Sequence, residues 1–152
     1  MSAGAIIVHS LDHARAAASV AAELQRSVTL VSAPGAAAYA GPAWFAALVR
    51  LVRGEFPSAR LRAVLDCGEA PGFALAALRE GGIDAVRLAA PQAVLAKVAA
   101  IAAQSGAGID DDEGAGLDLL GTDDPRAACR AFLCPAPESR TGARHHDRRH
   151  DR

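Results

Sequence analysis

A carboxylate, a thiol and a tight turn stand together in the run Leu65-Asp66-Cys67-Gly68-Glu69-Ala70-Pro71-Gly72. The run ends an apolar stretch and leads into a segment that Pro71 suits as the first residue of a helix. A cysteine becomes nucleophilic when an imidazole or a helix N-terminus lowers the pKa of its thiol. Cys67 is therefore a candidate nucleophile, although small buried cysteines also commonly end strands without any reactivity.

Asp66 has two interpretations. It could act as a general base, a metal ligand or a contact to substrate. It could equally accept hydrogen bonds from backbone N–H groups of the Gly68–Pro71 turn, as aspartate often does. The turn role is favoured because it needs no second functional group. The next carboxylate, Glu69, lies just before the expected helix, where a negative charge is favourable.

His9 is the histidine that could lower the pKa of the Cys67 thiol, because it ends the first apolar run, Ala5-Ile6-Ile7-Val8. Ser10 follows it and fits the N-cap of a helix. His13 is four residues from His9, but His9 belongs to a strand, so the helical spacing of two metal ligands does not apply and no metal site is predicted. The catalytic candidates are thus Cys67, His9 and Asp66. The candidate ligand-binding residues are Ser10, Ser32, Gly35, Gly68 and Glu69.

No cofactor is predicted. The loop 33–41 precedes a helix and could bind an anion through backbone N–H groups. It lacks the Lys-Ser/Thr pair of a P-loop, and no G-x-G-x-x-G follows the first strand. The acidic run 110–113 lacks the alternating ligands of a calcium loop.

Four strand–helix units, each about 25 residues long, position these residues. Short apolar runs predict strands at 5–9, 27–32, 61–67 and 85–89, and helical spacing predicts helices after each of them. Such alternation predicts an α/β fold with a parallel sheet and right-handed crossovers. We expect a small doubly wound sheet of four strands in the order 2-1-3-4, which resembles flavodoxin-like and Rossmann-like domains. In that order His9 lies beside Asp66 and Cys67. The alternative is the order 1-2-3-4 of a half-barrel, which separates His9 from Cys67.

The 152 residues suit one domain. Residues 1–134 are expected to form it, with strand–helix units to about 106 and a helical extension over 107–134. Within that extension, Leu117, Leu119 and Leu120 form either a short fifth strand or a docking segment, and Asp124 and Pro125 begin a last helix. The Arg/His-rich tail 135–152 has no apolar periodicity and is predicted to be disordered.

Composition and charge limit the kinds of binding partner to be expected. The sequence is 51% hydrophobic but only 4% aromatic, so Ala-rich helix faces are expected, and those of the first and fourth helices could pair in a homodimer. The net charge of -1 gives the folded part no basic surface for nucleic acid. No apolar run reaches the length of a membrane span. Three cysteines without a signal peptide indicate a reducing, cytoplasmic location.

The function expected from these features is that of a binding or regulatory module. It would hold a small polar molecule or a protein partner at the carboxyl ends of the strands, where open α/β sheets bind ligands. The alternative is a small cofactor-free enzyme that uses Cys67 with His9 or Asp66. The sequence leaves open whether the protein is an enzyme.

Overall fold

The computed structural model describes residues 4–112, 114 and 116–134. The strands are β1 (Gly4–Val8), β2 (Ser27–Ser32), β3 (Arg60–Asp66), β4 (Ala85–Arg87), β5 (Gly108–Ile109) and β6 (Leu117–Asp118). The helices are α1 (Leu11–Leu24), α2 (Ala36–Tyr39), α3 (Pro42–Glu55), α4 (Pro71–Glu80), α5 (Gln92–Gln104) and α6 (Pro125–Leu133). The tail 135–152 that was predicted to be disordered lies outside the described residues.

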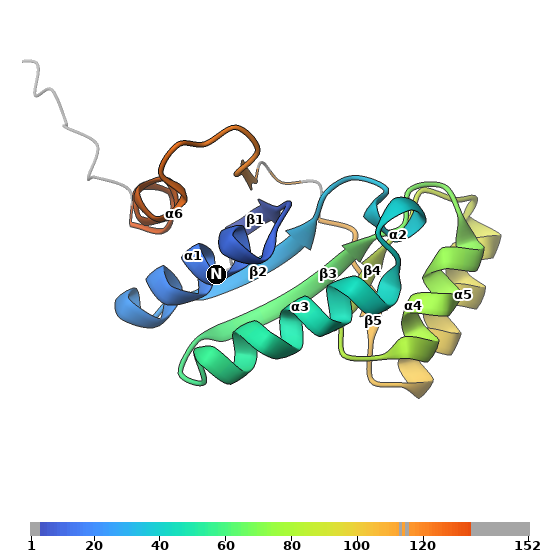
Figure 1. The fold of residues 1–152 in the computed structure, drawn as a ribbon. Helices are drawn as coiled ribbons and strands as arrows, with labels where there is room; N and C mark the ends of the chain where they lie inside the picture. Colours follow the sequence, from blue (N-terminus) through green and yellow to red (C-terminus); the bar gives the residue numbers. More distant parts are fainter. Residues whose placement is uncertain (1–3, 113, 115, 135–152) are drawn as a thin grey trace, which may run out of the picture.

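The six strands form one parallel sheet in the order β5-β4-β3-β2-β1-β6 (Figure 1). The α/β class and the parallel sheet are confirmed, but the expected number of four strands is wrong. The order 2-1-3-4 is also wrong, since β2 lies between β1 and β3. For the first four strands the sequence of neighbours is that of the half-barrel alternative.

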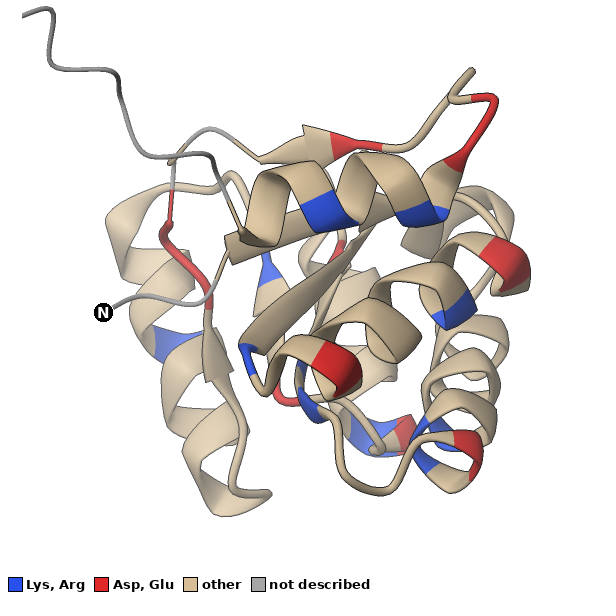
Figure 2. Ribbon diagram, turned by 90° about the vertical axis from the view of Figure 1, so that its left-hand side faces the viewer, with Lys and Arg blue, Asp and Glu red and all other residues tan. Residues whose placement is uncertain are grey.

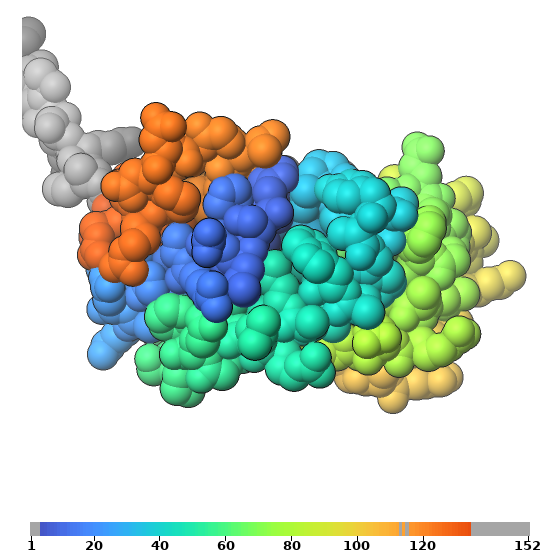
Figure 3. Space-filling view, in the orientation of Figure 1, coloured from blue at the N-terminus to red at the C-terminus, as the bar shows by residue number. Residues whose placement is uncertain are grey.

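The helices follow the strand order, because α6 contacts α1, α1 contacts α3, α3 contacts α4 and α4 contacts α5. From β2 to β5, each strand lies beside the strand that precedes it in the chain. Each of these steps moves in the same direction across the sheet. Right-handed crossovers then put every connecting helix on the same face of the sheet. The doubly wound arrangement, with helices on both faces, is therefore incorrect. Figure 3 shows the closed outer surface of this helix row.

Side chains alternate between the two faces of the sheet, as the pleat requires. On β3, Ala63 and Leu65 face the main core beneath the helices, whereas Val64 faces the opposite side. There Val64 joins Val31 and Ala85 in a second, small buried cluster, against which Ala5 and Ile7 pack. Both faces of the central strands are thus buried, which explains their continuous apolar sequence.

The last elements of the chain return to the first. β6 pairs with β1, and α6 contacts α1, at the end of the sheet that faces the viewer in Figure 2. Arg126 and Arg130 of α6 both bind Glu23 of α1. The Ala-rich face of α1 is consequently buried within the chain, so it is not available to a second copy, while most of the alanines of α5 remain exposed.

Helix starts agree with their sequence signals. Pro42, Pro71 and Pro125 each occupy the first position of a helix, where the missing N–H costs no hydrogen bond. Asp124 caps α6 by accepting from the N–H of Ala127 at 3.0 Å. The residues 36–39, expected as loop, form the single turn of α2. No helix in the described ranges has the length and apolar character to cross a membrane.

Candidate functional site

Asp66 ties two turns together at the carboxyl ends of β2 and β3. Its Oδ1 accepts the N–H of Gly35 at 3.0 Å and that of Gly68 at 2.9 Å. Its own N–H donates to Oγ of Ser32 at 2.8 Å, and that hydroxyl donates to the carbonyl of Ala33 at 3.2 Å. The two glycines have φ values of 67° and 58°, a left-handed conformation that glycine adopts without steric cost. The turn role foreseen for Asp66 is therefore present.

This network occupies most of the polar groups predicted to bind a ligand. The N–H groups of Gly35 and Gly68 are already bonded to Asp66, and Ser32 is only 1% exposed. Glu69 is exposed beside the network. In the structure, Ser32, Gly35 and Gly68 hold the loops that follow β2 and β3.

Cys67 lies at the end of β3 with its side chain in the core. The residue is 2% exposed, and its thiol donates to the carbonyl of Leu65 at 3.6 Å. Burial, and then the charge of Asp66, raise the pKa of the Cys67 thiol to about 12. A nucleophilic cysteine needs the opposite shift. Because β2 separates β1 from β3, His9 does not lie beside Cys67, and the pairing expected for the enzyme alternative is absent from the described structure.

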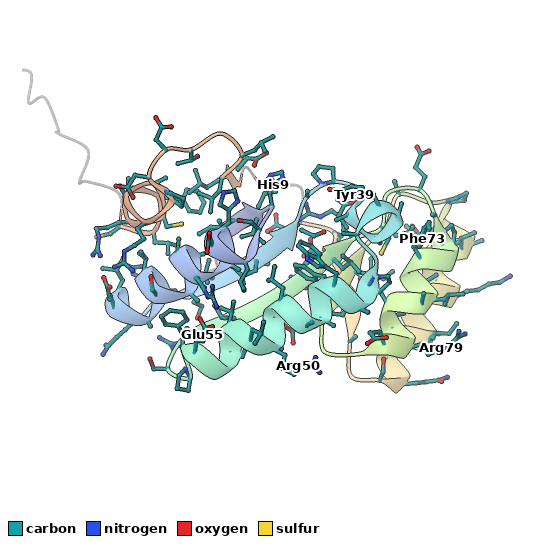
Figure 4. The ribbon with its side chains drawn as sticks, viewed as in Figure 1. His9, Tyr39, Arg50, Glu55, Phe73 and Arg79 are labelled. Atoms are coloured by element: carbon teal, nitrogen blue, oxygen red, sulfur yellow. The ribbon has the colours of Figure 1, made fainter. Side chains whose placement is uncertain are left out.

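His9 instead pairs with Asp118, at the neighbouring carboxyl ends of β1 and β6. The imidazole Nε2 lies 2.7 Å from Oδ1 of the carboxylate, and the two side chains are 19% and 48% exposed. The register that places Ile7 opposite Asp118 brings the two groups within reach. Figure 4 shows His9 at the end of β1, beside the segment that precedes α6. Both side chains of the pair are accessible to solvent.

His13 completes the group. Its Nδ1 accepts the backbone N–H of His9 at 3.1 Å, so a neutral His13 carries its proton on Nε2. Its ring meets that of His9 edge-on, with centroids 5.9 Å apart. Burial and His9 lower the pKa of His13, while Asp118 and Asp12 act in the opposite direction. The lowered pKa of His13 favours the neutral form of its imidazole.

Ser10 and Asp118 are oriented by local backbone contacts. Ser10 caps α1 by accepting the N–H of His13 at 3.2 Å, as its sequence position predicts. Asp118 accepts the N–H of Leu120 at 2.9 Å. This bond lowers the pKa of the Asp118 carboxyl; burial opposes it, and the hydrogen bond to His9 adds to it. Within the residues that the structure describes, no group of three or more His, Cys, Asp or Glu side chains could hold a metal ion.

Asp118 was not among the site residues predicted from the sequence. It lies 109 residues from His9, and β6 is only two residues long. The available signal was Leu117-Asp118-Leu119-Leu120, an apolar patch interrupted by a carboxylate, much as Leu65 precedes Asp66 at the end of β3.

A shallow hollow of about 420 Å³ lies further along the same edge, at the ends of β4 and β5. Its central groups are already paired. Oδ2 of Asp110 accepts from Nε and Nη2 of Arg87, at 3.1 and 2.8 Å, and Oδ1 accepts from Nη1 of Arg62 at 2.8 Å. Burial opposes ionisation here, but the hydrogen bonds from both arginines hold the pKa of Asp110 below its usual range. This cluster thus acts as a structural brace between β3, β4 and the end of β5.

Comparisons with known proteins identify the fold and no family. No family model and no curated protein matches the sequence. Among solved structures, the chain is similar to that of a "putative fructose-1,6-biphosphate aldolase" from Coccidioides immitis, with a TM-score of 0.56 and 20% sequence identity. The match covers 71% of this chain and 44% of the other, so this chain spans less than half of that protein. At this identity the likeness establishes a shared arrangement of parallel strands and helices.

Proposed function

We propose that the protein is a binding module for a small polar molecule, held at the carboxyl ends of β1 and β6. The observation that carries the proposal is the contact of 2.7 Å between Nε2 of His9 and Oδ1 of Asp118. It places an oriented, accessible imidazole at the edge where parallel α/β sheets bind ligands. In this proposal the protein acts in a reducing, cytoplasmic setting, which suits three free cysteines.

The hydrogen-bonding groups define the kind of ligand. Neutral His9 donates Nε2–H to Asp118, which leaves Nδ1 as an acceptor. Nδ1 has no partner among the described residues. Neutral His13 offers Nε2–H as a donor. A molecule that donates one hydrogen bond and accepts another, such as one with a hydroxyl beside a carbonyl, matches this pair.

The first test is the tautomer of His9. In ¹⁵N NMR spectra of the neutral imidazole, we expect Nε2 to be protonated and Nδ1 to be free in the wild-type protein. Asp118→Asn should remove the preference for that tautomer, whereas Asp123→Asn, at an exposed carboxylate nearby, should leave it unchanged. A Nδ1-protonated His9 in the wild-type protein would contradict the proposal.

The second test is ligand binding. A panel of small hydroxyacids, hydroxyketones and amides is screened by changes in the imidazole signals. Binding that perturbs His9 and His13 and is lost in His9→Gln, but kept in Asp123→Asn, supports the site. A ligand that binds His9→Gln as tightly as the wild-type protein refutes it.

A second candidate is an enzyme that uses the same pair in proton transfer. A carboxylate that fixes the imidazole tautomer and leaves the other nitrogen free is the arrangement of a general base. For a ligand found in the screen, exchange of its acidic C–H for deuterium in D₂O distinguishes the two functions. Exchange that is lost in Asp118→Asn indicates the enzyme, and binding without exchange indicates the module.

A further inference from the structure

A cleft of about 690 Å³ lies at the opposite edge of the sheet from His9. It is formed by the amino-terminal ends of β2 and β3 and by the connection between α3 and β3. Its lining comprises Ser27, Val28, Arg53, Phe56, Pro57, Ala59, Arg60, Leu61 and Arg62. Three arginines line it, and none of the lining residues is acidic.

The charge of Arg53 is balanced locally. Its Nη2 donates to Oδ2 of Asp84 at 2.7 Å and to the carbonyl of Leu61 at 3.1 Å. The same carboxylate oxygen accepts the N–H of Ala63 at 2.7 Å. Arg53 is therefore a fixed part of the cleft wall.

Arg60 leaves the cleft with a positive excess. Arg62 extends along the sheet to Asp110 at the end of β5, where Nη1 lies 2.8 Å from Oδ1, so its guanidinium group is paired away from the cleft. Arg60 donates Nη2 to the carbonyl of Gln25 at 2.8 Å and has no carboxylate partner in the described part of the chain.

Nearby carboxylates do not cancel this excess. Glu55 ends α3 close to the cleft, but both of its oxygens are bound by Arg15, at 2.9 and 2.7 Å. The carbonyl end of α3 carries only a partial negative charge. Phe56 and Pro57 add an apolar wall next to the arginines.

We propose that this cleft binds a small organic anion, with a carboxylate or phosphate group at Arg60 and an apolar body against Phe56. Guanidinium groups bind both kinds of oxyanion through paired hydrogen bonds. The volume lies within the range of small-molecule sites. The site is separate from the proposed ligand site at His9, since the two occupy opposite ends of the strands.

The experiment titrates phenyl phosphate, benzoate, inorganic phosphate and neutral benzyl alcohol into the full chain at low ionic strength, followed by backbone NMR. Phenyl phosphate or benzoate should perturb residues 56–62 and bind more tightly than inorganic phosphate or benzyl alcohol. Arg60→Gln should weaken binding about tenfold, the effect of losing one charge-assisted hydrogen bond.

Arg50→Gln is the matched control, because Arg50 lies exposed on α3 (Figure 4) and does not line the cleft. If Arg50→Gln and Arg60→Gln weakened anion binding equally, the effect would come from the overall charge of the protein, and the proposal would be overturned. Benzyl alcohol binding as tightly as phenyl phosphate would overturn it as well. His9→Gln should leave anion binding unchanged, so failure of either site is visible independently of the other.

Discussion

The N–H of Gly35 donates to Oδ1 of Asp66 at 3.0 Å and thereby joins the loop after β2 to the end of β3. The residues are 31 positions apart, yet the bond makes two loops into one unit. Asp66 is the shared acceptor of that unit, so its contribution is to the stability of this edge of the sheet.

We expect Asp66→Ala to lower the free energy of unfolding by about 2 kcal/mol, because it leaves two backbone N–H groups without their acceptor. The measurement is urea denaturation at pH 7. Glu69→Ala, at the exposed carboxylate three residues further on, is the control and should change stability by less than about 0.5 kcal/mol. Equal stability of Asp66→Ala and the wild-type protein would contradict the structural role.

The three thiols should differ in reactivity. Burial raises the pKa of Cys67 to about 12 and that of Cys129 to about 11, whereas Cys134 is exposed. With iodoacetamide at pH 7, mass spectrometry should show Cys134 modified first and the other two only after denaturation. Rapid modification of Cys67 in the folded protein would revive the nucleophile hypothesis.

Asp110→Asn should lower the free energy of unfolding at pH 7 by about 2 kcal/mol, since it removes the shared partner of two arginines that are themselves partly exposed. The arginines hold the pKa of the folded Asp110 below its ordinary value of 3.8. Its stabilisation is therefore complete above that value and is lost as the pH falls through the lower, folded pKa.

The difference between the wild-type protein and Asp110→Asn should accordingly be constant near neutrality and shrink only in strong acid. Denaturant titrations across this pH range measure it. Asp111→Asn, at an exposed neighbour, should show no such loss. A difference that disappears already at pH 6 would exclude the carboxylate as its source.

A homodimer remains a prediction for α5 alone, because α6 and α3 cover α1. Ile101 is 43% exposed among the exposed alanines of α5. If the wild-type protein is dimeric in light scattering at high concentration, Ile101→Glu should make it monomeric, while Lys97→Glu serves as a charge control on the same helix. A monomeric wild-type protein would exclude this interface.

Local sequence signals predicted most helices and strands. They did not predict the order of the strands in the sheet. Pro42 and Pro71 marked helix starts, and short apolar runs marked β1 to β4. Both strand orders considered are compatible with right-handed crossovers, so local periodicity could not distinguish them. The choice depends on which strands meet in space.

The strand order also decides which side chains meet at the candidate site. Cys67 and His9 could be partners only if their strands were neighbours, and β2 intervenes. The actual partner, Asp118, belongs to a strand of two residues, which is too short to show an alternating pattern. The turn role of Asp66 needed no long-range information, and it was the interpretation that the structure supports.

The pairing of β6 and α6 with β1 and α1 also bears on how the protein is made. During synthesis, β1 and α1 leave the ribosome more than a hundred residues before the segments that cover them. Until residues 117–133 emerge, one edge of β1 and the apolar side of α1 stay open to chaperones or to a neighbouring nascent chain. The units from β2 to α5 can pack as they appear, so β1 and α1 are fully covered only after the segments that follow them have packed.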